Sequence, residues 1–362
     1  MTPPLEVLTT NEPDRWMNAL HAVGEYDFYH LPGYQRLTES QVGGRAILPV
    51  FRCEGYAMAF PLLIRDIAIQ GIDSSGYRDA ACVPGLTGPL VSDSSLPDGV
   101  RHSIMQQFHD YLRQNKLVSV YNRLHFLMGQ EAFLSGYGEV HEEGIEVTVD
   151  LTAPPDVQYS RYRENHRRDL NRLRKLGFIC QEAGQECLDD FLRVYYETMD
   201  IVGAAQLYYH DKGYFEYLMT ELKDESRLFA CKDGQTVVCA GFIASCNGHV
   251  HYLRGGTATE YRNLAPSKLM LDTVRVWGNS VGARVFHLGG GASGARDSLY
   301  RFKMGFGGQE HPCHTWRYVA DPEVYDDLCR RAFALAGRTP DDSYFPEYRS
   351  PSLGLIQEAK RA

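Results

Sequence analysis

Residues 226–256, SRLFACKDGQTVVCAGFIASCNGHVHYLRGG, decide the fold of the second half of the chain. This stretch predicts three consecutive strands, at 226–232, 236–246 and 248–255. Helices are predicted on both sides of the strands, at 156–176, 188–202, 211–223 and 266–281. Gly282 ends the last of these helices, and a further strand follows at 284–288. This succession of helices, strands, helix and strand predicts a domain of the α/β class.

The first half of the chain repeats this order of elements on a smaller scale. Helices are predicted at 11–24 and 33–41, strands at 44–53 and 56–64, a helix at 98–115 and a strand at 117–124. The segment from Gly71 to Pro89 is rich in Gly, Pro and Ser and predicts a loop. Two halves with one plan suggest a duplication, an inference that rests on the order of the elements.

The length of 362 residues also favours two domains, because it exceeds what one hydrophobic core usually organises. The break at Thr152-Ala-Pro-Pro155 marks the expected junction. We therefore expect an N-terminal domain at 1–150, a C-terminal domain at 151–320 and a tail at 321–362. The tail is expected to be an appendage with one helix near 322–336.

Composition excludes several classes of protein. Apolar residues make up 44% of the chain and charged residues 23%, as in ordinary soluble proteins, and no apolar run approaches the roughly 18–20 residues of a bilayer span. The N-terminus lacks a basic and then apolar leader, so we expect a cytoplasmic protein without membrane insertion. Nine cysteines without a C-x-x-C spacing argue against a disulfide framework. The net charge of -9 argues against DNA binding and requires a local basic patch for any RNA partner.

The densest basic stretch is RYRENHRRDLNRLRK, from Arg161 to Lys175, with seven cations and two anions inside a predicted helix. At helical spacing Arg161, Arg168, Arg172 and Lys175 share a face, while Arg163, Arg167 and Arg174 lie on its flank. Such a face is suited to phosphate contacts. The alternative is a solvated helix whose arginines pair with Glu164 and Asp169.

A glycine-rich loop follows the predicted strand at 284–288. Leu288-Gly-Gly-Gly291 supplies flexible backbone at the carboxyl end of a strand, where α/β folds often bind ligands. A clean G-x-G-x-x-G at the start of a helix and a G-x-x-x-x-G-K-[ST] are both missing, so Rossmann and P-loop nucleotide sites are not supported. Further on, Phe302 and Lys303 stand beside a Gly-Phe-Gly turn, where the cation could face a ligand.

Metal and covalent-nucleophile sites are poorly supported. Among the histidines and cysteines of the second half, His249, His251, His311, Cys313 and His314 do not complete a recognisable ligand spacing. The G-x-S-x-G pattern of a serine hydrolase is missing as well. We therefore expect chemistry without a metal and without a covalent enzyme intermediate.

Four stretches of the second half together resemble the Fem-type (FemABX-like) aminoacyl transferases and the related BioF2-like branch of the GNAT acyltransferase superfamily. They are Tyr162-Arg-Glu-Asn-His-Arg-Arg168, Val250-His-Tyr-Leu-Arg-Gly-Gly-Thr257 with Pro266, Trp277 to Gly291, and Leu299-Tyr-Arg-Phe-Lys-Met-Gly-Phe-Gly307. The first half matches less sharply, through Tyr77 to Leu90 and through Arg123-Leu-His125. The resemblance therefore covers most of the chain.

The resemblance implies two tandem GNAT-like domains of the α/β (α+β) class, each a mixed, mostly antiparallel sheet flanked by helices. It also implies an enzyme that moves an aminoacyl group from aminoacyl-tRNA to an amine of a small molecule or peptide and forms an amide bond, with no cofactor. Phe302 and Lys303 match the catalytic Phe-Lys pair of the family, whose lysine stabilises negative charge. An aminoacyl ester is already activated, so aligned substrates and a fixed cation suffice for the transfer.

Binding residues are expected around this pair. Candidates for substrate contacts are Tyr209, Tyr252, Arg254, Thr257 and Ser267. Candidates for contacts with tRNA are Arg163, Arg167, Arg168 and Arg172.

Departures from the family pattern bear on the acceptor and the donor. Ile201 stands where cell-wall members are expected to carry arginine, and Arg254 where tyrosine is frequent, which favours a smaller amine, such as a natural-product intermediate, over a cell-wall precursor. The second alternative is an acyl-CoA donor. Arg262-Asn-Leu-Ala-Pro-Ser267 lacks the glycines of a pyrophosphate loop, which favours tRNA. A third alternative, a non-catalytic binding module, would not require Lys303.

Overall fold

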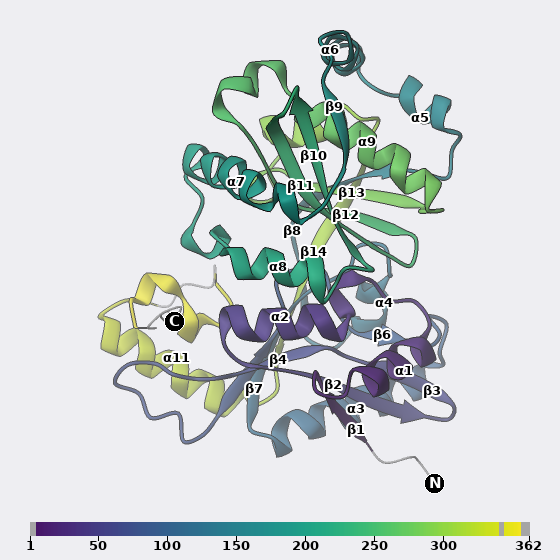
Figure 1. The fold of residues 1–362 in the computed structure, drawn as a ribbon. Coiled ribbons are helices and arrows are strands. Elements are labelled where there is room, and N and C mark those ends of the chain that lie inside the picture. Colours follow the sequence, from purple (N-terminus) through teal and green to yellow (C-terminus); the bar gives the residue numbers. More distant parts are fainter. Residues whose placement is uncertain (1–4, 340–343, 356–362) are drawn as a thin grey trace. The chain divides into compact units, whose positions relative to one another are not determined.

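The computed structural model describes residues 5–339 and 344–355 of the chain (Figure 1). Its residues fall into two compact units, one formed by residues 1–143 with 313–362 and the other by residues 144–312. The chain thus leaves the first unit within β8 (Glu139–Asp150) and returns to it within β14 (Gln309–Val319).

The second unit is built on the three predicted strands, which form an antiparallel meander of β10 (Ser226–Asp233), β11 (Thr236–Cys246) and β12 (His249–Thr257). On one side β9 (Ile179–Ala183) pairs with β10, and on the other β13 (Val285–Gly290) runs parallel to β12. Residues 146–150 of β8 complete this sheet, antiparallel to β13. The order is therefore β9-β10-β11-β12-β13-β8.

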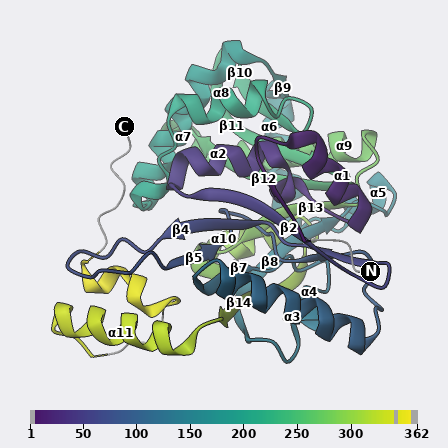
Figure 2. The ribbon, with the colours of Figure 1, turned by 90° about the horizontal axis from the view of Figure 1, so that it is seen from below.

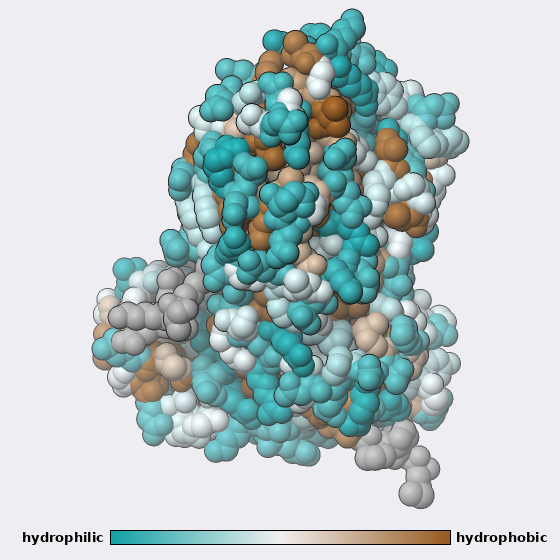
Figure 3. Space-filling model, viewed as in Figure 1, coloured by the Kyte–Doolittle hydropathy of each residue, from teal (hydrophilic) through white to brown (hydrophobic). Residues whose placement is uncertain are grey.

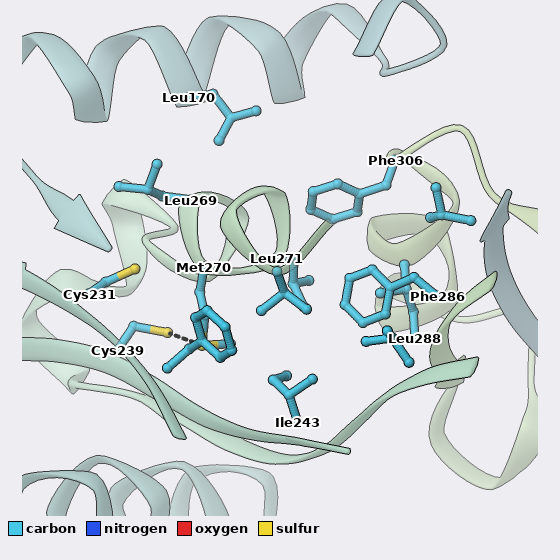
Figure 4. Close-up of a cluster of buried hydrophobic side chains, with 14 of the residues drawn as sticks. Leu170, Cys231, Cys239, Ile243, Leu269, Met270, Leu271, Phe286, Leu288 and Phe306 are labelled. Atoms are coloured by element: carbon cyan, nitrogen blue, oxygen red, sulfur yellow. Dashed lines mark hydrogen bonds between the residues drawn. The ribbon is translucent and has the colours of Figure 1, made fainter. Parts of the chain in front are cut away.

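Helices cover both faces of this sheet. α9 (Ser267–Ser280) packs on β9, β10 and β11, with α6 (Glu164–Lys175) against it, while α7 (Leu188–Val202) and α8 (Lys212–Thr220) pack on the opposite face (Figure 1). The main core surrounds α9: Cys231, Ile243, Met270 and Phe286 lie on the side of the sheet, and Leu170 packs on α9 from α6 (Figure 4). Gly256 permits the close approach of α7, because a Cβ at this position would lie 2.1 Å from the carbonyl oxygen of Val194.

The first unit follows the same plan. Its strands, in sequence order, are β1 (Glu6–Thr9), β2 (Arg45–Cys53), β3 (Tyr56–Ala59), β4 (Leu62–Asp66), β5 (Arg78–Ala81), β6 (Leu90–Val91) and β7 (Leu117–Arg123). The order in the sheet is β6-β3-β2-β4-β5-β7-β14, with β1 on β2. Figure 2 shows α1 (Pro13–Val23) and α2 (Pro32–Val42) on one face of this sheet and α3 (Asp98–Gln114) on the other.

A helix and a parallel strand follow the antiparallel strands in both units. In the first unit β5, α3 and β7 form this crossover, and in the second β12, α9 and β13. An antiparallel strand then flanks the parallel one: β14 pairs with β7, and β8 pairs with β13. The expected α/β class, with two mixed and mostly antiparallel sheets flanked by helices, is confirmed.

The C-terminal segment is part of the first unit and not an appendage. α11 (Pro322–Ala336) begins and ends where the sequence predicts, but its apolar face packs against Ile67, Ile69 and Val118. Tyr348 is fully buried, and its hydroxyl lies 3.0 Å from the Ser119 hydroxyl. The first boundary also differs, since the second unit begins at residue 144 instead of 151.

Several predicted elements differ in detail. The single helix expected at 156–176 is two helices, α5 (Pro155–Ser160) and α6, because Arg163 has extended backbone angles. The strand expected at 56–64 is split into β3 and β4 near Pro61, which lacks the N–H that a continuous ladder needs. The loop expected at 71–89 contains β5. Further elements without a prediction are β1, β6, β8, β9 and β14 and the short helices α4 (Gln130–Leu134) and α10 (Ser298–Met304).

Three cysteines lie in a row across the second sheet. Cys231 on β10 is directly opposite Cys180 on β9 and directly opposite Cys239 on β11. Cys231 and Cys239 are buried, whereas Cys180 is half-buried. Burial raises the pKa of the Cys239 thiol to about 12, so this cysteine is an inert apolar core residue.

Among the described residues, no helix is both long and apolar enough to cross a membrane.

Candidate active site in the second unit

The candidate site begins where two parallel strands of the second unit separate. β12 and β13 pair only through residues 249–251 and 285–287, although β12 continues to Thr257 and β13 to Gly290. Each strand has an irregularity just beyond the last pair, at Leu253 and at Leu288. Such bulges bend a strand and re-aim its side chains. The described ladder thus opens at the carboxyl ends of the strands, where backbone N–H and C=O groups of both edges can receive a ligand.

Lys303 lies at the β13 side of this opening. It belongs to α10, which Asp297 caps by accepting a hydrogen bond from the backbone N–H of Tyr300. Its Nζ donates to the Gly290 carbonyl over 2.6 Å, and the side chain is only 9% exposed. Gly289 has a positive φ, and a Cβ there would lie 3.0 Å from this Nζ, so the glycine-rich segment makes room for the ammonium group.

Lys303 has a lowered basicity in this environment. Burial lowers its pKa from 10.5 to about 8, while the carboxylates of Glu146 and Asp297 act in the opposite direction. Near neutral pH the amine is therefore still largely a cation. Since the ammonium has three N–H donors and one reaches Gly290, two remain for a developing oxyanion.

A buried polar chain stands behind Lys303. Glu146 on β8 accepts a hydrogen bond from His287 Nε2 at 3.0 Å, and His287 Nδ1 lies 3.1 Å from His251 Nδ1. Burial lowers the pKa of His287 to about 4, so this imidazole is neutral at physiological pH. An ionised carboxylate only accepts, so we assign the proton of His287 to Nε2 and the donor of the second bond to His251. Neither Glu146 nor His287 is predicted as a site residue: the strand that carries Glu146 is not predicted, and His287 lies in a predicted strand without a recognisable motif.

Phe302, the other half of the expected pair, connects α10 to the basic helix. Its carbonyl lies 3.0 Å from His166 Nε2, and its ring packs at 5.5 Å from the His166 ring. Gly305 makes this possible, since a Cβ there would come within 2.3 Å of the same imidazole. The neighbouring Arg163 donates to the Arg301 carbonyl over 3.1 Å. The amino end of α6 is thus fixed to the helix that carries Lys303.

The basic stretch divides between anchoring and exposed residues. Arg174 pairs with the buried Asp272 on α9 at 2.5 Å, so it anchors α6 to the core. Arg161 lies before α6 and pairs with Asp150, so it does not share the expected helix face. Arg167 is half-buried and donates to the Ser160 carbonyl at 3.3 Å.

The exposed face of α6 remains strongly basic. Among the described residues Arg168 is paired only with its neighbour Asp169, at 3.7 Å, and its side chain is 75% exposed. Arg172 and Lys175 are exposed and have no ion-pair partner within the described part of the chain. Figure 3 shows hydrophilic side chains over this helix. The groove between them, about 570 Å³, is lined only by α6 and the residue after it, so it is an open surface on one helix and not an enclosed pocket.

Two expected substrate-binding residues on β12 are involved in packing. The Tyr252 side chain lies over Gly241 and Gly255: a Cβ at Gly241 would come within 2.9 Å of its ring, and a Cβ at Gly255 within 2.2 Å of its hydroxyl oxygen. Burial raises the pKa of Tyr252 well above its usual range. The Thr257 backbone N–H donates to the Thr198 hydroxyl at 2.9 Å, which ties the end of β12 to α7. In this structure both residues therefore shape the walls of the site.

The remaining expected substrate residues are dispersed. Arg254 points to the face covered by α7, with its guanidinium 6.0 Å from the centre of the Tyr208 ring. Tyr209 follows α7, donates to Asp200 at 2.8 Å and stacks on Tyr196. Ser267 is the first residue of α9 and is half-buried. Arg254 and Tyr209 therefore share a side of the sheet, whereas Ser267 belongs to the opposite layer.

The start of α9 offers few free donors for an anion. The backbone N–H groups of Lys268 and Leu269 already donate to the carbonyls of Ala265 and Pro266, at 3.0 and 2.9 Å. The Lys268 side chain is buried and pairs with Asp169 at 2.5 Å. A pyrophosphate bound at a helix N-terminus needs such N–H groups to be free.

Comparison with known proteins agrees with this architecture. The acetyltransferase (GNAT) domain family matches residues 160–304, which include α6, β12, β13 and Lys303. The solved structure of FemX has a TM-score of 0.70 at 15% identity, covering 90% of this chain and 99% of that one. No curated protein matches the chain by sequence.

Two further structures share the fold. The C-terminal domain of a putative lysylphosphatidylglycerol synthetase from Agrobacterium fabrum has a TM-score of 0.51 at 14% identity, covering 88% of this chain and 96% of that one. A tandem GNAT protein from the clavulanic acid biosynthesis pathway has a TM-score of 0.50 at 11% identity, covering 88% of this chain and 99% of that one. The chain thus shares its fold with FemX and with a tandem GNAT protein, as the resemblance in its sequence implies.

Proposed function

We propose that this chain, with its tandem GNAT fold, is an acyltransferase that moves an aminoacyl group from aminoacyl-tRNA to an amine of a small molecule or peptide. The observation that carries the proposal is the buried ammonium of Lys303 at the opening between β12 and β13. FemX, which shares the fold over nearly its whole length, supports a Fem-type reaction in preference to other GNAT chemistry. A tRNA donor also implies a reaction in the cytoplasm.

The transfer needs only groups of the kind found here. The amine nitrogen attacks the ester carbonyl, a C–N bond forms, and the carbonyl oxygen becomes an oxyanion beside Lys303. The tetrahedral intermediate then breaks its C–O ester bond, and the terminal ribose hydroxyl of the tRNA leaves with a proton. The amine gives up one proton in the same sequence, so atoms and charges balance. Phe302 holds Lys303 in place through the contact of its carbonyl with His166.

Two observations support tRNA over an acyl-CoA donor. The exposed cations Arg168, Arg172 and Lys175 suit a polyanion, with Arg163 and Arg167 at the end of α6 nearest to α10. At α9, the occupied N–H groups of Lys268 and Leu269 disfavour a pyrophosphate. On the acceptor side, Arg254, Tyr209 and Ser267 are proposed contacts, with Tyr252 and Thr257 shaping the walls.

The test offers both classes of donor to the purified protein. One reaction series contains a panel of charged tRNAs, the other a panel of acyl-CoAs, and each contains the same mixed pool of amines. We expect products with the mass of an aminoacyl amide in the first series only. RNase treatment before the assay should abolish them.

The same experiment decides between the alternatives. Product formed only from acyl-CoA, and insensitive to RNase, would establish the CoA-dependent alternative and require the α9 N-terminus to rearrange. Transfer to a peptidoglycan precursor in preference to small amines would establish the cell-wall alternative. Absence of product with every donor would remove the proposed activity.

A further inference from the structure

Glu146 is a buried carboxylate for which the transfer mechanism has no direct use. It is 5% exposed, and it stands opposite Gly290 in the pairing of β8 with β13. Gly290 is also the residue whose carbonyl receives the hydrogen bond from Lys303. A Cβ placed on the adjacent Gly289 would lie 3.0 Å from Lys303 Nζ and 3.9 Å from Glu146 Oε2. The ammonium and the carboxylate thus lie close to one point of the glycine-rich segment.

His287 fixes the position of this carboxylate. Its Nε2 is 3.0 Å from Glu146 Oε2, and its Nδ1 is engaged with His251, so the imidazole is bonded at both nitrogens. His287 is 8% exposed and neutral at physiological pH. A neutral donor stabilises the carboxylate without cancelling its charge. His287 therefore fixes the carboxylate without placing a second positive charge beside Lys303.

The charged and titratable groups that face Lys303 in the described residues come from three elements. They are Glu146 on β8, His287 on β13 and Asp297 at the start of α10. Asp297 is already committed to the backbone N–H groups of Tyr300 and Ala292, and it is only half-buried, so solvent screens its field at Lys303 more than that of the buried Glu146. Burial favours the neutral form of Lys303 and lowers its pKa. Glu146 is the buried group whose negative charge raises that pKa.

We propose that Glu146 is a positioning residue that keeps Lys303 in its cationic form, and that neutral His287 holds the Glu146 carboxylate in place. This inference rests on the proposed role of Lys303 in acyl transfer. Without the carboxylate, the same buried amine would be largely neutral at the pH at which the protein works. It would then lose the charge that an oxyanion requires.

The decisive measurement follows the ionisation of Lys303 itself, without any substrate. The protein is labelled with ¹³C-lysine, and the Lys303 side-chain resonance is assigned by its loss in Lys303→Arg and followed against pH by NMR. Glu146→Gln preserves the shape of the side chain and an oxygen that can accept from His287. In this variant we expect the titration midpoint of Lys303 to fall by about one pH unit or more. Glu146→Asp, which keeps the charge, should restore most of the difference.

Asp297→Asn serves as the matched control, because it removes the other carboxylate that faces Lys303. It should move the titration midpoint of Lys303 less than Glu146→Gln, since Asp297 is half-buried and its carboxylate is bound to the backbone N–H groups of Tyr300 and Ala292. An unchanged Lys303 midpoint in folded Glu146→Gln, or equal effects of the two variants, would overturn the inference. His287→Leu provides a second test. The titration midpoint of Lys303 should fall in this variant too, and an unchanged midpoint would contradict the proposed role of His287.

Activity then separates the inference from the proposed function. The alkaline limb of the pH–rate profile should move to lower pH in Glu146→Gln, together with the NMR midpoint. If the midpoint moves but the wild-type protein transfers no acyl group from any donor, the proposed function fails and the inference stands. If the protein transfers the acyl group, and Glu146→Gln moves the NMR midpoint of Lys303 but not the alkaline limb of the pH–rate profile, the charge of Lys303 is not used in the reaction.

Discussion

At the scale of single residues, a cation is buried where most proteins avoid one. Lys303 has one hydrogen-bond partner in the described residues, the Gly290 carbonyl, and a nearby carboxylate with which it forms no direct pair. Burial of a charge without full pairing costs stability. Such an arrangement is typical of a functional site, where a charge must meet a substrate that arrives later.

Replacement of Lys303 by methionine tests its role in transfer. Lys303→Met keeps the length of the side chain and removes the donors, so single-turnover transfer should fall by about 10²–10³-fold, the effect of losing one oxyanion donor. Arg301→Met is the matched control, because Arg301 is an exposed cation on the same helix. The control should retain nearly full activity, and a Lys303→Met rate close to that of the wild-type protein would exclude the assignment.

Wild-type turnover should also depend on pH with a defined sign. The pKa of Lys303 is lowered to about 8, so the amine is charged below that pH and loses its proton above it. With a saturating donor, the rate should therefore decline as pH rises through about 8. A profile that keeps rising to pH 10 would show that the neutral amine suffices.

At the scale of elements, α6 shows how one helix combines two surfaces. His166, Leu170 and Leu173 recur at helical spacing and face the core, whereas Arg168, Arg172 and Lys175 face solvent. The Asp272 carboxylate, held by Arg275 at 3.0 Å, binds Arg174 and thereby fixes the helix on α9. Only part of the basic stretch is therefore available to a partner.

Charge reversal on the exposed face of α6 tests its proposed contact with tRNA. The double variant Arg168→Glu with Arg172→Glu should weaken donor binding and reduce the slope of log K against log salt by about 0.7 per lost contact, if the single-strand value applies. The control reverses Arg330 and Arg331 on α11, which changes the net charge by the same amount. Equal affinities and slopes for both variants would mean that α6 is only a solvated helix.

Most elements could be predicted from the sequence, and the failures have physical causes. α7, α11 and β11 have the predicted bounds because apolar spacing and flanking turn residues agree there. β8 and β14 were missed because their outer halves are exposed and polar, so neither shows a clear apolar run. With β8 absent, Glu146 had no predicted neighbour, whereas Lys303 could be singled out from its motif alone. Contacts across a sheet depend on register, which a single sequence does not reveal.

At the scale of the whole molecule, the described C-terminal residues complete the first unit. Ile67, Ile69 and Val118 are at most 4% exposed and form one cluster with α11, Tyr348 and Leu353. Arg349 adds a salt bridge with the fully buried Asp79, which also accepts from the Tyr348 hydroxyl at 3.2 Å. This cluster combines residues between 67 and 118 with residues between 319 and 355, so it is complete only when the C-terminal segment is in place.

Deletion of residues 321–362 should therefore destabilise the first unit. Each large aliphatic side chain that becomes exposed costs about 1.5–3 kcal/mol, so the deletion should lower the melting temperature strongly. Tyr348→Phe, which removes only a hydroxyl group, should cost about 1 kcal/mol. Thermal denaturation measures both, and an unchanged melting temperature after deletion would show that the segment is dispensable.

The row of Cys180, Cys231 and Cys239 provides the second unit with an internal reporter of local opening. A thiol-alkylating reagent can reach the half-buried Cys180 in the folded protein. It can reach the two interior cysteines, whose thiols contact Pro266 and Met270, only when α9 moves away from the sheet or the strands separate. We expect Cys180 to be modified early, and Cys231 and Cys239 to react together, much later and at a rate that denaturant accelerates. Peptide mass spectrometry over time distinguishes the three sites, and early modification of Cys231 would contradict a stable packing of α9 on the sheet. The kinetics of alkylation would thus measure the rate of local opening in the core of the second unit.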